Sequence, residues 1–203
     1  MKAQIVAAIG RPAYLALFNG LSLVLLAWLI VAAGRAPYIG LWEQQIWQRW
    51  LANLAMPLAV AFAVFGTGAI NPLSLGGRRV GFDPARPGIA GLVRHPLLWA
   101  LLVWSCVHAV VKGDLAHVLL FGGFAVMAIA GMLAIDARRR DQFGAANWKR
   151  LAESTSLLPG AAWLAGRWHP KSGPSPWRMA LAMALWISVL WLHPIVIGVS
   201  PLP

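Results

Sequence analysis

The chain has 203 residues, of which 60% are hydrophobic and only 11% are charged, and its mean hydropathy is +0.68. A soluble domain carries about a quarter charged residues, so this composition excludes an ordinary soluble protein and indicates an all-α integral membrane protein with a single domain, residues 1–203. The net charge of +11 would suggest a nucleic-acid partner in a soluble protein, but beside a lipid bilayer it is typical of cytoplasmic loops that face anionic headgroups.

Five apolar stretches are candidates for membrane-spanning helices, and together they predict a polytopic helix bundle. They cover about residues 13–33, 51–70, 96–111, 115–135 and 179–199. Because a bilayer needs ~20 apolar residues, we expect the short third stretch to extend into its flanks. Pro57 falls early in the second stretch, where a missing N–H is best tolerated. We expect the fourth stretch to continue beyond the membrane, with a surface helix near Trp148.

The basic residues predict the orientation of these helices. Fourteen of the 17 lysines and arginines fall in the N-terminal arm and in the second and fourth loops, and only Arg35, Arg49 and Lys112 fall on the other side. Positive residues gather on the cytoplasmic side of a membrane, so we expect the N-terminus inside and the C-terminus outside. The fourteen are Lys2, Arg11, Arg78, Arg79, Arg86, Arg94, Arg138, Arg139, Arg140, Lys149, Arg150, Arg167, Lys171 and Arg178.

This orientation places three histidines from three helices at one depth in the outer leaflet. His108 lies near the outer end of the third stretch, His117 at the start of the fourth, and His193 in the outer third of the fifth. Neutral imidazole is the commonest metal ligand and binds haem iron axially, so these positions indicate a cofactor site. Trp104 precedes His108 by four residues and therefore lies on the same helical face, where it would form one wall of that site.

The alternative is that each histidine only forms a hydrogen bond near a helix end. His117 lies beside Lys112 and Asp114, and His193 is followed by Pro194, which frees a backbone carbonyl that the ring can bond. Polar residues near helix ends cost less than polar residues at the centre of a membrane. The spacing of these residues is compatible with both interpretations.

A second group of polar residues stands at the inner end of the third stretch. Arg94 and His95 precede Pro96, which suits the first turn of a helix, and a helix N-terminus beside a guanidinium can bind an anion. Asp136 and the arginines that follow it up to Arg140 would complete a polar mouth. The alternative is that these residues only anchor the helix ends to lipid phosphates.

Several of these motifs together resemble the NnrU family of bacterial membrane proteins, over most of the chain. They are Arg94-His95-Pro96, Trp104-xxx-His108, Gly113-Asp114, Leu120-Phe121-Gly122, Asp136-Ala-Arg138-Arg139 and the tail Leu192-His193-Pro194 to Gly198-Val199-Ser200-Pro201. The same motifs are similar to zeta-carotene isomerase, a membrane enzyme that uses haem b to isomerise a cis double bond. The resemblance implies a protein of the bacterial inner membrane with haem b at His108. Such a protein would act on a lipophilic polyene or serve nitrogen-oxide metabolism in denitrification.

The resemblance also implies a second haem ligand. In that family another helix, with the partner histidine, precedes the segment that resembles residues 2–14. Either the start of the chain is misplaced, or the chain is shortened and this ligand is lost or replaced. His193 is then the first substitute to test, so His108 and His193 are the candidate metal ligands.

A remote resemblance connects the inner face with isoprenylcysteine carboxyl methyltransferases, which bind S-adenosylmethionine through similar cytoplasmic residues. The matching residues are Arg94-His95-Pro96, Phe143-Gly144, Trp148 and Leu157-Leu158-Pro159, whereas Leu97-Leu98-Trp99 and Asp141-Gln142 depart from that pattern. A methyltransferase in which Arg94 and His95 bind the cofactor is therefore a second hypothesis, and a haem-free membrane scaffold is a third.

Overall fold

The computed structural model describes residues 2–78 and 80–203, and these residues form helices, turns and loops with two isolated β-bridges. The five long helices are α2 (Arg11–Arg35), α3 (Ile46–Gly66), α5 (Pro96–Lys112), α6 (Leu115–Phe143) and α9 (Pro176–Val196). The short helices are α1 (Lys2–Ile9), α4 (Ile89–Leu92), α7 (Ala145–Ala152) and α8 (Ala161–Leu164). Four long helices have the length and apolarity to cross a membrane, and α5 is a shorter apolar helix. The predicted all-α membrane bundle is confirmed. Of the fourteen basic residues used to predict the orientation, Arg79 lies outside the described residues.

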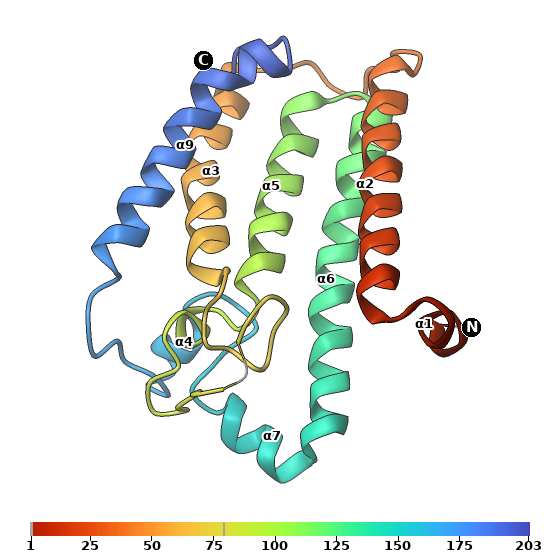
Figure 1. Ribbon diagram of the computed structural model, residues 1–203. Coiled ribbons are helices and arrows are strands. Elements are labelled where there is room, and N and C mark those ends of the chain that lie inside the picture. Colours follow the sequence, from red (N-terminus) through yellow and green to blue (C-terminus); the bar gives the residue numbers. More distant parts are fainter. Residues whose placement is uncertain (1, 79) are drawn as a thin grey trace.

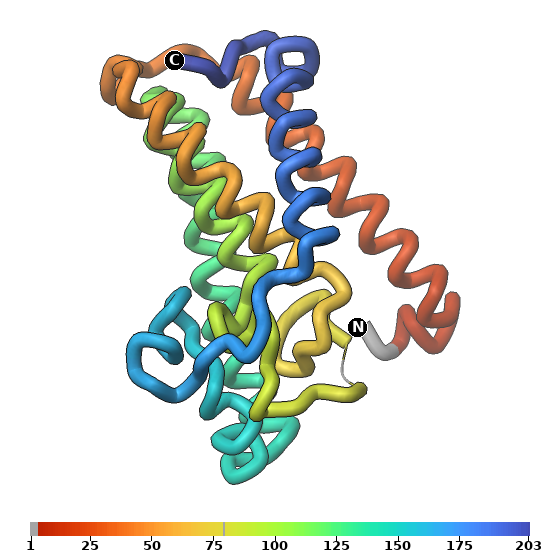
Figure 2. Tube along the Cα trace, turned by 90° about the vertical axis from the view of Figure 1, so that its left-hand side faces the viewer, coloured from red at the N-terminus to blue at the C-terminus, as the bar shows by residue number. Residues whose placement is uncertain are grey.

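The long helices stand side by side in an order that differs from their order in the chain. α3 packs against α5 and α9, and α6 packs against α5 and α2. Figure 1 therefore shows the sequence α9, α3, α5, α6, α2 across the bundle, with α9 and α2 at its edges. The N-terminal and C-terminal segments lie toward opposite ends of the bundle in both views (Figures 1 and 2).

The third spanning helix does not extend into its flanks, so that prediction is wrong. α5 has 17 residues, begins at Pro96, and ends where Gly113 adopts a left-handed conformation with φ 65°. A Cβ added to Gly113 would lie 2.5 Å from the carbonyl oxygen of Trp42, so the close approach of these two segments requires glycine. At 1.5 Å per residue the helix is about 26 Å long, slightly less than the hydrocarbon thickness of a bilayer.

The second spanning helix begins earlier than predicted, and this changes the place of Pro57. α3 starts at Ile46, so Pro57 lies inside the helix and not near its start. The reason is a cap in which the Gln48 side chain accepts a hydrogen bond of 2.6 Å from the backbone N–H of Gln45. The predictions for the fourth stretch are confirmed. α6 continues beyond the predicted span to Phe143, and the short helix α7 contains Trp148.

The two ends of the bundle differ in structure. We call the end with residues 67–95 and 144–175 the basic end, and the end with residues 36–45, 113–114 and 197–203 the distal end. Most of the largest fully buried side chains lie at the basic end: Leu73, His95, Val93, Asn71 and Thr155. The spanning helices instead expose many large apolar side chains, which suits contact with lipid. The core also includes buried apolar residues of the spanning helices, such as Phe62, Val107 and Met132, so it extends from the bundle into the basic end.

Candidate functional site

His108 lies in an aromatic cluster near the distal end of α5. Its Nδ1–H donates a hydrogen bond of 2.8 Å to the carbonyl oxygen of Trp104, one turn earlier. Its ring centroid is 5.0 Å from that of Trp104 and 5.1 Å from that of Phe121 on α6, and Phe124 lies 6.0 Å from Trp104. A carbonyl oxygen can only accept, so the proton is on Nδ1 and the neutral ring keeps a lone pair on Nε2.

His193 lies near the distal end of α9 and is bonded in the same way. Its Nδ1–H donates a hydrogen bond of 2.6 Å to the carbonyl oxygen of Val199, which follows the helix. The acceptor is therefore not the carbonyl that Pro194 frees inside α9. His193 and His108 stand on α9 and α5, two helices that both pack against α3. Both side chains are partly exposed.

The third outer histidine, His117, belongs to the cap of α6. Its Nδ1 forms a hydrogen bond of 2.8 Å with Asp114 Oδ1, and the same oxygen accepts the backbone N–H of His117 at 3.1 Å. Burial raises the pKa of Asp114, but the hydrogen bonds and the charge of His117 hold the pKa below its ordinary value overall. The Asp114 carboxylate therefore stays ionised at neutral pH and stabilises the first turn of α6.

At the basic end, one carboxylate joins the two polar residues that precede α5. Asp136 accepts a hydrogen bond from Arg94 through Oδ2 and pairs with His95 Nε2 through Oδ1 at 2.8 Å. The other ring nitrogen of His95 lies 3.0 Å from the hydroxyl of Ser74, and the His95 side chain is fully buried. Arg94 Nε also donates to the hydroxyl of Thr155 at 2.9 Å.

The backbone of Arg94 extends this cluster into two loops. Its carbonyl accepts the side-chain amide of Asn71 at 2.8 Å, and its N–H donates to the carbonyl of Ser156 at 2.8 Å. The Arg94 guanidinium also lies over the ring of Trp148, 5.2 Å from the centroid. Arg94 and His95 thus hold α6, α7 and two loops together. Because both ring nitrogens of His95 are already bonded, a methyl donor could not bind there without displacing these contacts.

Of the polar mouth that the sequence predicts, Asp136 joins Arg94 and His95. Arg138 and Arg140 are exposed and form no hydrogen bond or ion pair within the described chain. The residues from 2 to 78 and from 80 to 203 also contain no group of three or more metal-binding side chains. Haem iron needs only one or two axial histidines and no such group.

The family model described as NnrU protein matches residues 1–201. The chain belongs to the NnrU family. No curated protein and no solved structure matches it. The predicted resemblance is thus confirmed at the level of the family, and the chain is an NnrU-type membrane protein.

Several residues that shape these two clusters of the NnrU chain were not identified from its sequence. Ser74, Thr155 and Asn71 reach Arg94 and His95 from irregular loops, whose polar residues show no periodic pattern that predicts a contact. The sequence did contain a pattern that predicts the aromatic residues beside His108. Phe121 and Phe124 are three residues apart on an apolar helix, a spacing that places both rings on one face.

Proposed function

We propose that this NnrU-family protein binds haem b near its distal end, with His108 as one iron ligand and His193 as the other. One observation carries the proposal: both rings donate Nδ1–H to a backbone carbonyl and so keep Nε2 free for a metal. Histidines that bind metals usually donate their other ring N–H to a carbonyl or carboxylate, which fixes the tautomer and the orientation of the ring. The residues present therefore fit a haem iron.

The two histidines also stand at the same level in the bundle. His108 lies four residues before the end of α5, and His193 lies three residues before the end of α9. Both helices run from the basic end to the distal end (Figure 1), so each ring is roughly 5 Å from its helix end. α3 packs against both α5 and α9, so the two histidines lie at one level on either side of α3. Cofactor sites in helical bundles are built from side chains that several helices contribute.

The surroundings of His108 suit a flat apolar group. Trp104 and Phe121 touch at an edge-to-face angle of 80°, and both contact the His108 ring. Such rings offer apolar faces to a porphyrin and to a lipophilic molecule that enters from the bilayer. The protein's contribution is to orient the imidazoles, to keep water away from them and to leave access from lipid.

When bound, haem would supply a Lewis-acid or redox centre and, when ferrous, a site that binds nitric oxide. Two roles follow from this chemistry in a bacterial inner membrane. One is the cis–trans isomerisation of a lipophilic polyene, and the other is a part in nitrogen-oxide metabolism. A change in the reduced spectrum on addition of nitric oxide would favour the second role. Conversion of a cis polyene by the purified protein would favour the first.

The test is an absorption spectrum of the full chain, produced with added haem precursor, purified in detergent, and measured oxidised and after reduction with dithionite. We expect a Soret band that His108→Ala abolishes. His169→Ala is the matched control, because His169 is exposed in a basic-end loop. A Soret band of equal intensity in His108→Ala, or no haem after reconstitution with hemin, would overturn the proposal.

A further inference from the structure

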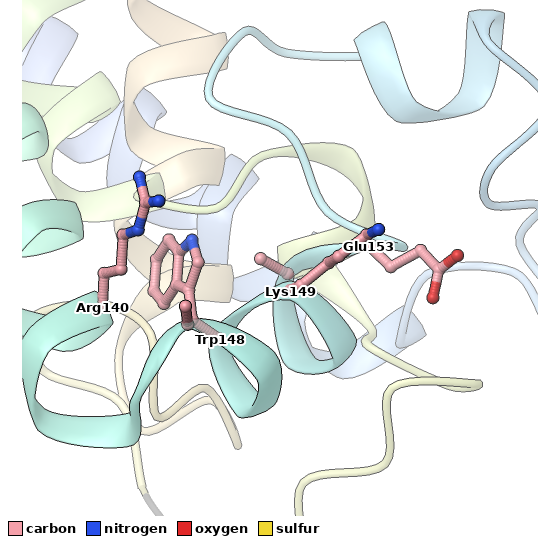
Figure 3. Close-up of a pocket in the computed structure, with 6 residues that line it drawn as sticks. Arg140, Trp148, Lys149 and Glu153 are labelled. Atoms are coloured by element: carbon pink, nitrogen blue, oxygen red, sulfur yellow. The ribbon is translucent and has the colours of Figure 1, made fainter.

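An open surface cavity of about 430 Å³ lies between the end of α6 and α7, at the basic end and away from His108 and His193. Its walls are Arg140, Ala145, Trp148, Lys149, Ala152 and Glu153, four of which are labelled in Figure 3. We propose that this cavity binds an anionic phosphate ester, such as the headgroup of an acidic phospholipid. The proposal does not depend on whether the protein binds haem.

The charges in the cavity favour an anion. Arg140 and Lys149 contribute two positive charges, and neither forms an ion pair with any residue in the described ranges. Glu153 is the one acid in the wall, and Figure 3 shows its carboxylate directed away from Arg140 and Trp148. A guanidinium presents a planar fork of donors that matches two phosphate oxygens. The Lys149 side chain is directed toward Glu153, so Arg140 is the donor beside Trp148 and Lys149 adds positive charge on the other side of the cavity, beside the acid (Figure 3).

Trp148, the aromatic residue in the cavity wall, is held in place by Arg94. Trp148 lies under the guanidinium of Arg94, which is itself paired with Asp136 and bonded to Thr155. Figure 3 shows the indole of Trp148 beside the Arg140 side chain. Because this wall is fixed before a ligand arrives, little conformational freedom would be lost on binding.

The position of Arg140 along α6 points to lipid as the source of the phosphate. α6 has 29 residues, whereas a bilayer core needs ~20, so its last turns project beyond the hydrocarbon. Arg140 is five residues past Ile135, the last residue of the predicted span, and at 1.5 Å per residue this places it about 7 Å outside the hydrocarbon. Lipid phosphates lie at that level.

The experiment uses the full chain in a neutral detergent and counts bound lipid by native mass spectrometry. Phosphatidylglycerol is compared with phosphatidylcholine, and a second arm replaces the lipid with glycerol 3-phosphate, which has no acyl chains. We expect retention of phosphatidylglycerol over phosphatidylcholine, and a loss of about fivefold in affinity for Arg140→Gln and for Lys149→Gln. Both side chains are exposed, so unchanged melting curves will show that the variants fold.

Arg150→Gln is the matched control, because Arg150 neighbours Lys149 on the same short helix but does not line the cavity. It should bind as the unaltered chain does. If only glycerol 3-phosphate is retained, with the same loss in Arg140→Gln and Lys149→Gln, the site takes a soluble phosphate ester and the proposal stands. Equal losses in Arg150→Gln and Arg140→Gln would mean diffuse attraction to a basic surface and would overturn the site. No preference for the anionic compound in either arm would also overturn it.

Discussion

At the scale of single residues, Asp136 joins two side chains at the basic end. Its two oxygens serve two consecutive residues, Arg94 and His95, although a single carboxylate usually pairs with one. This is possible because His95 is the N-cap of α5 but makes no side-chain cap, so its ring is free to turn toward α6. The pairing buries an imidazole and part of a guanidinium that would otherwise be costly to remove from water.

We predict that Asp136→Asn lowers the stability of the protein by about 3 kcal/mol, because Arg94 and a fully buried His95 lose their charged partner. Thermal unfolding of the detergent-solubilised chain measures this change. Asp141→Asn removes an exposed carboxylate from the same helix and should alter stability by no more than about 0.5 kcal/mol. Equal effects of the two substitutions would contradict the role of Asp136.

At the scale of elements, α5 is fixed at both ends, and this sets the level of His108. Pro96 begins the helix, and at the other end two side chains of the distal end and one from the first turn of α3 donate to its last carbonyls. Trp42 Nε1 and the Gln48 side chain donate to the carbonyl of Val110 at 2.8 and 3.0 Å, and Gln44 donates to that of Val111 at 3.1 Å. These bonds satisfy carbonyls that the helix itself leaves unpaired.

We predict that Gly113→Ala destabilises the protein by about 2 kcal/mol, because alanine is strained at φ 65° and its Cβ would meet the Trp42 carbonyl. Unfolding temperatures in detergent provide the measurement. Gly122→Ala is the control, since Gly122 is helical and has nothing within 4 Å of an added Cβ. Alanine is better than glycine there by roughly 1 kcal/mol at most. A Gly113→Ala protein as stable as the unaltered chain would show that the turn can relax.

Hydropathy predicted the cores of these elements but not their ends. The apolar stretches marked all five long helices, because the membrane selects residues over ~20 consecutive positions. The ends depend on particular caps, such as Gln45 with Gln48 at α3 and Gly113 at α5, so α3 began earlier and α5 stayed shorter than predicted. The same contrast holds in the candidate sites. The helical spacing linked Trp104 with His108, whereas Ser74 and Thr155 reach His95 and Arg94 from loops that have no period.

At the scale of the whole molecule, the spanning helices suit contact with lipid, whereas the basic end buries polar and apolar side chains within the protein. In the spans, α2 has no buried residue and α9 buries only Ala182, so their apolar side chains face lipid. At the basic end the loops bury Leu73, Val93 and the polar cluster around His95. Part of the buried core therefore lies at the basic end, and the bundle is held mainly by the packing of α3, α5 and α6.

The charge distribution predicts that the basic end faces the cytoplasm, and cysteine labelling tests this. In a Cys106→Ala background, we expect Glu43→Cys at the distal end to react with a membrane-impermeant maleimide on intact cells. Ser172→Cys at the basic end should react only after lysis. Both native side chains are exposed, so the reagent can reach either position once it is on the correct side. The reverse labelling pattern would contradict the predicted orientation.

The central claim is that His108 and His193 hold one haem iron between them, and electron paramagnetic resonance of the oxidised, haem-loaded chain tests it most directly. Two imidazole ligands predict a low-spin signal. His193→Ala should keep haem through His108 but convert the signal to high spin, whereas His117→Ala should leave it low-spin, because the His117 ring is bonded to Asp114. A low-spin signal that persists in His193→Ala, or one that is lost in His117→Ala, would contradict the claim.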